Sequence, residues 1–302
     1  MMKRVVITGA MGNLGWKLCQ HLMSNESIAR VVGLDLHTPK PPQLAELKGQ
    51  TNGSADIEFV ACDLADINDR RWRDEIDQCD VVVHFAAKNP YPEASWDDAN
   101  ASLDMTMNIA LAAVDAGCDR FVFASSNHVM GRYKDDPLAG TIGPGRLTTD
   151  LSHAVGTLWH TGDRQMDSTV YAVAKSSGER ICHVLAARSQ ARTQFACLRI
   201  GWCQPGENQP ATLSAAGTPT QTASSPSSTG DDFAVTDQWF KSMWLSNRDF
   251  VQLFEKAIFA DGNTWPSGCV VVNGMSANSE MPWSLDEGRR WLDYRPLDNA
   301  YA

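Results

Sequence analysis

The sequence lacks an excess of positive charge. Its 302 residues contain 26 lysines and arginines against 36 aspartates and glutamates, which gives a formal net charge of −10 at pH 7. Proteins that bind nucleic acid or anionic membrane surfaces concentrate positive charge where they bind. The composition therefore argues against both partners, whereas a pocket for a small anionic substrate would need only one or two local cations.

The sequence also lacks any pairing pattern among its cysteines. The eight cysteines are scattered, with no C-x-x-C pair and no cluster with histidine. In a chain of this length, the scatter predicts reduced thiols and a cytoplasmic location, with neither a disulfide framework nor a metal site.

Long hydrophobic runs are absent as well. No apolar stretch approaches the length of a membrane span, and the N-terminus leads into a predicted strand with no signal peptide. A hydrophobic content of 43% and a charged content of 21% are ordinary for a globular enzyme. We therefore expect a soluble, cytoplasmic protein.

Short apolar runs alternate with stretches of helical periodicity along the chain. This alternation predicts an α/β fold with a Rossmann-like, doubly wound parallel sheet. The predicted strands are 5–8, 31–34, 59–61, 81–85, 121–124, 195–200 and 269–273, and the predicted helices are 16–24, 103–116, 176–187, 249–260 and 285–292.

The change in composition near residue 206 suggests a division of the chain. We expect residues 1–200 to form the dinucleotide-binding domain and 201–302 a small substrate-binding region that is not an independent domain. Residues 206–238 begin with many small and polar side chains and predict a flexible loop. The long connection 131–170 is expected to fold over the site.

Three glycines lie between the first strand and the first helix, at Gly9, Gly12 and Gly15. In this context they predict a turn around Asn13 and Leu14 whose backbone approaches a pyrophosphate at the helix N-terminus. Asp35 ends the second strand, where a carboxylate accepts both ribose hydroxyls and repels a 2′-phosphate, so NAD is the expected cofactor. Asp63 and Leu64 follow the third strand and suit the adenine edge.

Tyr171 and Lys175 are separated by four residues in the sequence Y-A-V-A-K. In a helix, this spacing places both side chains on one face. A tyrosine has an ordinary pKa of about 10, and a neighbouring cation favours the phenolate. The pair therefore predicts a tyrosine that accepts a proton, with a pKa lowered by Lys175.

Taken together, these motifs resemble the extended short-chain dehydrogenase/reductase family, which includes NAD-dependent epimerases and dehydratases. The resemblance includes T-G-A-M-G-N-L-G at 8–15, H-F-A-A at 84–87, S-S-N-H-V-M-G at 125–131 and L-R-I-G at 198–201. It implies a catalytic set of Ser126, Tyr171 and Lys175. It also adds Ala86, Ala87, Tyr171 and Lys175 to the cofactor contacts, and it implies a homodimer.

Within this family, the sequence looks most like the uronate dehydrogenases. That resemblance implies oxidation of the C1 hydroxyl of a free sugar or sugar acid to a lactone, with Tyr171 as base, Ser126 holding the reacting oxygen and Lys175 binding the nicotinamide ribose. The residues expected to contact the sugar are Lys88, Asn89, Ser126, Asn127, His128, Ser246 and Arg248.

The nature of the substrate's C6 group stays open. Uronate dehydrogenases are expected to carry an arginine for the substrate carboxylate before their W-x-S motif, and the corresponding stretch 239–243 has none. Lys88, Lys241 or Arg248 could replace it, but a lysine lacks the bidentate fork of arginine. A nucleotide-sugar epimerase or dehydratase with tightly bound NAD is the alternative function.

Overall fold

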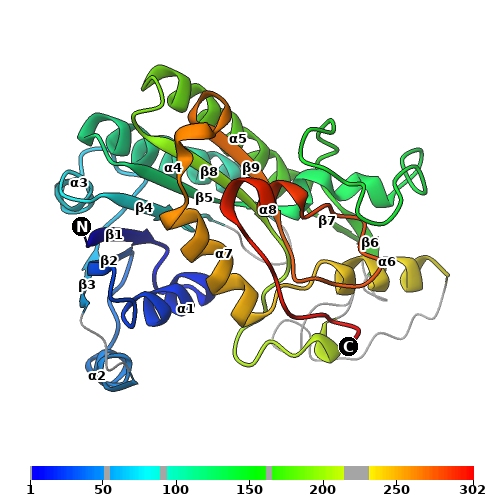
Figure 1. Cartoon of the computed structure of the whole chain (residues 1–302), viewed down its shortest axis with the longest axis horizontal. Helices are drawn as coiled ribbons and strands as arrows, with labels where there is room; N and C mark the ends of the chain where they lie inside the picture. Colours follow the sequence, from blue (N-terminus) through cyan, green and yellow to red (C-terminus); the bar gives the residue numbers. More distant parts are fainter. Residues whose placement is uncertain (1, 51–54, 89–93, 161–164, 214–230) are drawn as a thin grey trace.

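A seven-stranded parallel sheet forms the centre of the computed structural model, which describes residues 2–50, 55–88, 94–160, 165–213 and 231–302 (Figure 1). The strand order is β3-β2-β1-β4-β5-β8-β9. The strands are β1 (Lys3–Thr8), β2 (Ile28–Asp35), β3 (Asp56–Ala61), β4 (Val81–His84), β5 (Arg120–Ser126), β8 (Gln194–Ile200) and β9 (Cys269–Gly274).

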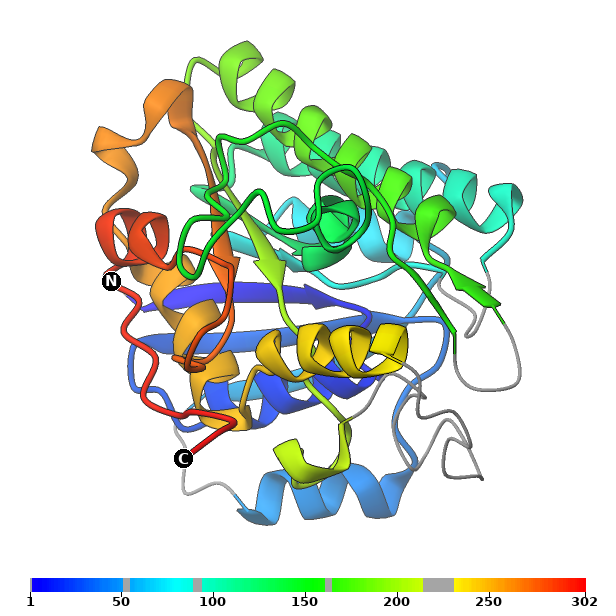
Figure 2. The same ribbon diagram turned by 90° about the vertical axis from the view of Figure 1, so that its right-hand side faces the viewer.

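Helices cover both faces of this sheet (Figure 2). One face packs on α1 and α7, and the other packs on α3, α4 and α5. Such double cover explains why the strands read as continuous apolar runs instead of alternating ones. The helices are α1 (Asn13–Leu22), α2 (Pro41–Gln50), α3 (Arg70–Ile76), α4 (Trp96–Ala116), α5 (Thr169–Arg188), α6 (Asp231–Ser242), α7 (Asn247–Phe259) and α8 (Asp286–Leu292).

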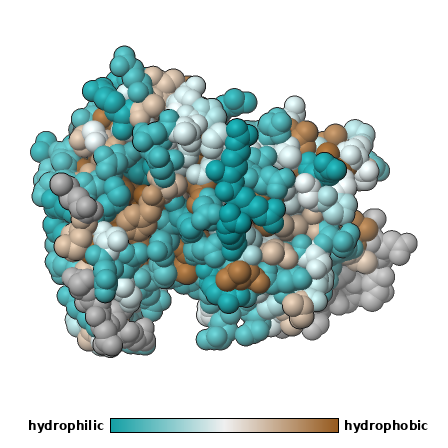
Figure 3. Space-filling model, in the orientation of Figure 1, coloured by the Kyte–Doolittle hydropathy of each residue, from teal (hydrophilic) through white to brown (hydrophobic). Residues whose placement is uncertain are grey.

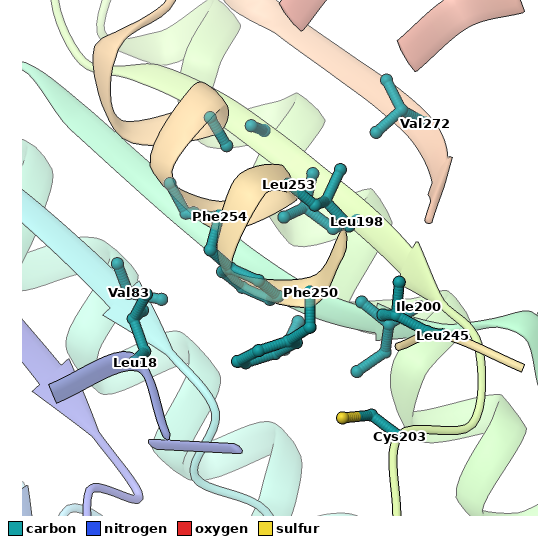
Figure 4. Close-up of a cluster of buried hydrophobic side chains, with 14 of the residues drawn as sticks. Leu18, Val83, Leu198, Ile200, Cys203, Leu245, Phe250, Leu253, Phe254 and Val272 are labelled. Atoms are coloured by element: carbon teal, nitrogen blue, oxygen red, sulfur yellow. The ribbon is translucent and has the colours of Figure 1, made fainter. Parts of the chain in front are cut away.

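The C-terminal third contributes to this same core. Strand β9 pairs with β8 and forms one edge of the sheet, and helix α7 packs against one face of the sheet. Figure 4 shows Phe250, Leu253 and Phe254 of α7 close to Leu198 of β8. All four side chains are fully buried, so the region beyond residue 200 shares one hydrophobic core with the dinucleotide-binding strands.

The predicted Rossmann-like fold is confirmed, and several element boundaries are corrected. Helix α5 begins at Thr169, seven residues before the predicted helix, and therefore carries Tyr171 and Lys175. Helix α6 begins at Asp231, inside the predicted loop 206–238, of which 214–230 lie outside the described residues. Helices α2 and α3 and the hairpin of β6 (Leu158–His160) and β7 (Gln165–Asp167) were not predicted.

The face of the molecule in Figure 3 is largely hydrophilic, with scattered apolar residues. Within the described ranges, every helix is too short or too polar to cross a membrane.

Candidate active site

A cavity of about 670 Å³ opens where β1, β2, β3 and β4 end. Ligands of doubly wound α/β proteins bind at this edge of the sheet. The lining includes all ten residues outside the catalytic set that the sequence assigned to the cofactor: Gly9, Gly12, Asn13, Leu14, Gly15, Asp35, Asp63, Leu64, Ala86 and Ala87.

The glycine turn leaves room for a phosphate because side chains are excluded from it. Gly9 has φ of +68°, and a Cβ added there would lie 2.9 Å from the backbone nitrogen of Ala86. A Cβ on Gly15 would lie 2.3 Å from the carbonyl oxygen of Gly9, so only glycine lets α1 approach β1 this closely. Gly12 caps α1 without a side-chain hydrogen bond, which leaves amides of the first turn available to an anion.

Asp35 is held rigidly at the rim of this cavity. Its carboxylate accepts hydrogen bonds from the backbone nitrogens of Met11 (2.9 Å) and Leu36 (2.7 Å). A fixed carboxylate at the end of β2 accepts ribose hydroxyls and repels a 2′-phosphate. The glycine cradle and this carboxylate together fit NAD.

Replacing Asp35 by alanine should weaken NAD binding by about tenfold or more, since hydrogen bonds to a charged group contribute about 1.5–3 kcal/mol. The matched variant Asp35→Asn keeps the shape and removes the charge, so it should lose less NAD affinity yet reduce the preference over NADP. Titration of both cofactors by the quenching of tryptophan fluorescence checks this. If the two variants keep the wild-type preference, another residue reads the ribose.

Polar side chains hold the loops that follow β3 and β4, in which Asp63 and Ala86 lie. Asn108 donates to the carbonyl oxygen of Leu64 at 2.9 Å, and Thr8 Oγ1 accepts from the backbone nitrogen of Ala86 at 3.2 Å. The same Thr8 hydroxyl bonds to His84 Nδ1 at 2.8 Å, in a buried position where the pKa of His84 falls to about 3. A neutral His84 thus supports the cofactor-facing loop after β4.

Ser126, Tyr171 and Lys175 lie near one another at the end of β5. Ser126 is the last residue of β5, and Tyr171 and Lys175 lie on α5, which packs against that strand. The Ser126 side chain is near enough to Tyr171 to lower the pKa of the phenol, and its hydroxyl accepts from the backbone nitrogen of His128 at 3.2 Å.

The expectation that Lys175 lowers the pKa of Tyr171 is wrong for this structure. Burial raises the pKa of Tyr171, and the hydrogen bond from Ser126 opposes that rise. The Lys175 ammonium donates to the carbonyl oxygen of Ala124 at 2.7 Å and lies 5.8 Å from the centre of the Tyr171 ring. Burial also lowers the pKa of Lys175 to about 8. Desolvation therefore sets the direction of the pKa shift at both groups.

His128 and Asn127 lie directly beside this serine–tyrosine pair. His128 Nδ1 is within hydrogen-bond distance of the hydroxyls of Thr157 (2.8 Å) and Ser168 (2.9 Å), and burial lowers its pKa to about 4, so the ring is neutral. Its edge contact with the Tyr171 ring has a centroid distance of 5.9 Å. Asn127 is buried and donates to the carbonyl oxygen of Ile200, while its own carbonyl oxygen has no partner among the described residues.

Aromatic rings also pack beside His128. Phe240 of α6 makes ring contacts with His128, Trp159 and Trp202 at centroid distances of 6.4, 5.3 and 5.1 Å. Trp159 and Phe240 are buried, and both belong to the large core, whereas Trp202 is half-buried and packs against that core. Apolar rings therefore line one side of His128.

The three cations considered for a substrate carboxylate each have a carboxylate partner already. Lys88 pairs with Asp98 at 3.4 Å, and Lys241 pairs with Asp237 one helical turn away at 2.8 Å. Arg248 pairs with Asp298 from the C-terminal segment, and not with Asp249 as its position at the start of α7 suggested. Pairing of this kind competes with a ligand for each cation.

Ser246 also has its hydroxyl engaged within the fold. It is the N-cap of α7, where it accepts from the backbone nitrogen of Asp249 at 3.0 Å and donates to Asp298 at 2.5 Å. These bonds give Ser246 a role in capping the helix. The expected contact of Ser246 with the sugar therefore stays a prediction. Asn89 lies outside the described residues.

A second buried network of polar side chains lies next to β5, and the sequence did not predict it. Glu179 lies four residues after Lys175 on α5 and forms a two-point ion pair with Arg199 of β8, at 2.8 and 2.9 Å. Ser125, the neighbour of Ser126, donates to Glu179, and His153 contacts Arg199 at 2.7 Å. The four-residue spacing of Lys175 and Glu179 was the signal that the sequence offered for this network. The residues that they contact come from distant segments of the chain.

A glycine cradle with a ribose carboxylate, next to a Ser–Tyr–Lys set, defines a dinucleotide-dependent oxidoreductase. Residues 5–202 match the model of the "NAD dependent epimerase/dehydratase family". The chain belongs to this family.

Individual relatives cover nearly the whole chain. It is 30% identical over 300 residues to an L-arabinose 1-dehydrogenase (NAD(P)(+)) of Haloferax volcanii, covering 99% of this chain and 98% of the relative. It is 27% identical to a uronate dehydrogenase of Agrobacterium fabrum, covering 100% and 87%. Among solved structures, a uronate dehydrogenase mutant from Agrobacterium tumefaciens complexed with NAD aligns with a TM-score of 0.63 at 26% identity, covering 100% of this chain and 87% of that one.

These similarities confirm the predicted family, the NAD cofactor and the dehydrogenase class. They favour a sugar dehydrogenase over the alternative of an epimerase or dehydratase, because the dehydrogenase relatives match over nearly their full length. A dTDP-D-glucose 4,6-dehydratase of Mus musculus, in contrast, matches over 43% of this chain.

Proposed function

We propose that the protein oxidises the C1 hydroxyl of a free, uncharged aldose to the lactone, with NAD as electron acceptor. The observation that carries the choice of an uncharged sugar is the pairing of Lys88, Lys241 and Arg248 with carboxylates. The rings of Trp159 and Phe240 beside His128 support it, because a buried carboxylate without a cation would be destabilised. The relative named for L-arabinose, a neutral pentose, supports it as well.

The chemistry needs one group to remove a proton and others to hold the sugar. Tyr171 is the proposed proton acceptor, and the hydroxyl of Ser126, which lowers the pKa of Tyr171, holds the same C1 oxygen. Lys175 keeps positive charge beneath the tyrosine ring. NAD, when bound in the cavity of Gly9, Gly12 and Asp35, supplies the acceptor for the hydride from C1.

Two neighbours of the catalytic serine are suited to orient the sugar. The carbonyl oxygen of Asn127 is buried and has no partner in the described part of the chain, so it can accept a hydrogen bond from a sugar hydroxyl. His128 uses Nδ1 within the protein and keeps Nε2 as its second ring nitrogen. We assign both residues to substrate binding, together with Ser126.

Matched sugars test the proposal directly. D-galactose and D-galacturonate share the same ring and differ at C6, and L-arabinose is that ring without C6. We expect kcat/KM for the neutral sugars to exceed that for the uronate by about tenfold or more, since one tenfold step corresponds to about 1.4 kcal/mol. The absorbance of NADH formed from added NAD is the measurement.

Two other results would each have a clear meaning. A preference for galacturonate would contradict the choice of an uncharged sugar, and the variants Lys88→Ala, Lys241→Ala and Arg248→Ala would then identify the cation. If neither the sugars nor the uronate reduce NAD, while a UDP-sugar is interconverted, sugar oxidation itself is refuted.

We further infer a cytoplasmic homodimer. All eight cysteines are free, which fits a reducing compartment. Trp96 and Met107 of α4 and Val184 of α5 are exposed apolar residues on two helices that pack side by side, and such a surface fits a second copy of the chain. The molar mass from light scattering in solution decides between monomer and dimer.

A further inference from the structure

Two cysteines that are distant in sequence are in contact at the end of the sheet where the parallel strands begin, opposite the candidate active site. Cys79 precedes β4 and Cys118 precedes β5, and their sulfur atoms lie 3.4 Å apart. The helix α3, which leads into Cys79, lies on the side of the molecule where the N-terminus enters β1 (Figure 1). The site residues follow the carboxyl ends of the strands, so this pair is separate from them.

The strand register places the two cysteines at equivalent positions. Val81 pairs with Arg120 in adjacent parallel strands, and each cysteine stands two residues before its member of that pair. The backbone between them is also tied, because the carbonyl oxygen of Asp80 accepts from Asp119 at 2.8 Å and from Arg120 at 3.2 Å. Neighbouring strands are about 4.8 Å apart, within the Cα separation of about 4.4–6.8 Å that disulfides require.

Access to the pair comes through Cys79. The eight cysteines all lie in the described part of the chain, and Cys79 is the single one that is not fully buried. Cys118 is 1% exposed and lies behind it. An oxidant in solution can therefore reach the sulfur of Cys79, and the second thiol is already in contact to complete the reaction.

We infer that Cys79 and Cys118 form a thiol modification site, which small disulfide compounds convert to an intrachain disulfide. The Cys79 thiolate attacks one sulfur of the compound RSSR, which forms a mixed disulfide and releases RS⁻. The Cys118 thiolate then attacks Cys79 Sγ and releases the second RS⁻. The two protein thiols lose two electrons and two protons in total, and RSSR is reduced to two RSH.

The rate of this reaction depends on pH in a defined direction. The hydrogen bond with Cys118, followed by burial and the nearby Asp80 carboxylate, raises the pKa of Cys79. The thiolate is the attacking species. Bridging should therefore accelerate as the pH rises above neutral.

Oxidised glutathione added to the reduced, folded protein at mildly alkaline pH provides the test. We expect the count of titratable thiols to fall from eight to six. Proteolysis without reductant, followed by mass spectrometry, should then yield one peptide pair that joins Cys79 to Cys118. Cys118→Ser should trap a single glutathione on Cys79, and Cys79→Ser should keep its remaining seven thiols.

Cys269→Ser serves as the matched control, because Cys269 is buried and interacts with Cys197 elsewhere in the fold. This variant should form the bridge at the wild-type rate. The inference is overturned if wild-type Cys79 stays glutathionylated without bridging. It is equally overturned if Cys79 does not react, or if the linked peptides contain Cys182, Cys197 or Cys269.

Discussion

Replacing Tyr171 by phenylalanine should reduce kcat by about 10³-fold or more, within the range of about 10²–10⁴ for a general acid–base group. The substitution removes the hydroxyl whose pKa Ser126 lowers and keeps the ring that contacts His128. NAD affinity should stay near the wild-type value, because the cavity that fits the cofactor is built on β1 to β4. Initial rates of NADH formation and a separate NAD titration measure the two effects.

The pH dependence of the wild-type rate checks that this hydroxyl acts as the base. Burial raises the pKa of Tyr171, so the phenolate is scarce at neutral pH and increases with pH. The rate should therefore rise toward alkaline pH, and Ser126→Ala should shift that rise to still higher pH because Ser126 lowers the pKa of Tyr171. A Tyr171→Phe enzyme that keeps substantial activity with the wild-type pH profile would exclude Tyr171 as the base.

The parts of the site that could be predicted from sequence are encoded locally. The glycine turn requires three glycines within seven residues, and the Tyr–Lys pair requires one helical turn. Their geometry follows from the turn or the helix in which they lie. This is why the positions of Gly9, Asp35 and Tyr171 were predictable even though α5 begins earlier than its apolar pattern suggested.

The parts that could not be predicted depend on contacts between distant segments. Arg248 had an apparent partner in the adjacent Asp249, but the C-terminal segment brings Asp298 to it, 50 residues away. Asp249 is instead buried and accepts from Ser276 and from the backbone of Leu297. Likewise, spacing alone predicted a lower pKa for Tyr171, whereas burial of the phenol in the folded chain raises that pKa.

Loss of Glu179 should destabilise the protein more than any substitution at a surface ion pair. Both Glu179 and Arg199 have side chains no more than 2% exposed, and Glu179 also accepts from Ser125. Glu179→Ala leaves the guanidinium of Arg199 buried without its counter-charge. Breaking a buried pair in this way costs about 3–5 kcal/mol. The midpoint of thermal unfolding should fall by about 10 °C, given the slope of about 2–4 °C per kcal/mol for large domains.

The double variant Glu179→Leu with Arg199→Met separates an unpaired charge from a simple loss of packing. Replacement of both members of a buried ion pair by apolar residues of similar size is often close to neutral, so the double variant should recover most of the lost stability. Asp74→Ala is the surface control, since Asp74 and its partner Arg70 are largely exposed and the substitution should shift the midpoint little. Urea unfolding followed by circular dichroism gives the free energies. If the double variant is as unstable as Glu179→Ala, the cost comes from Ser125 and His153, which both lose their contact with the Glu179 carboxylate in either variant, and not from the charge of Arg199.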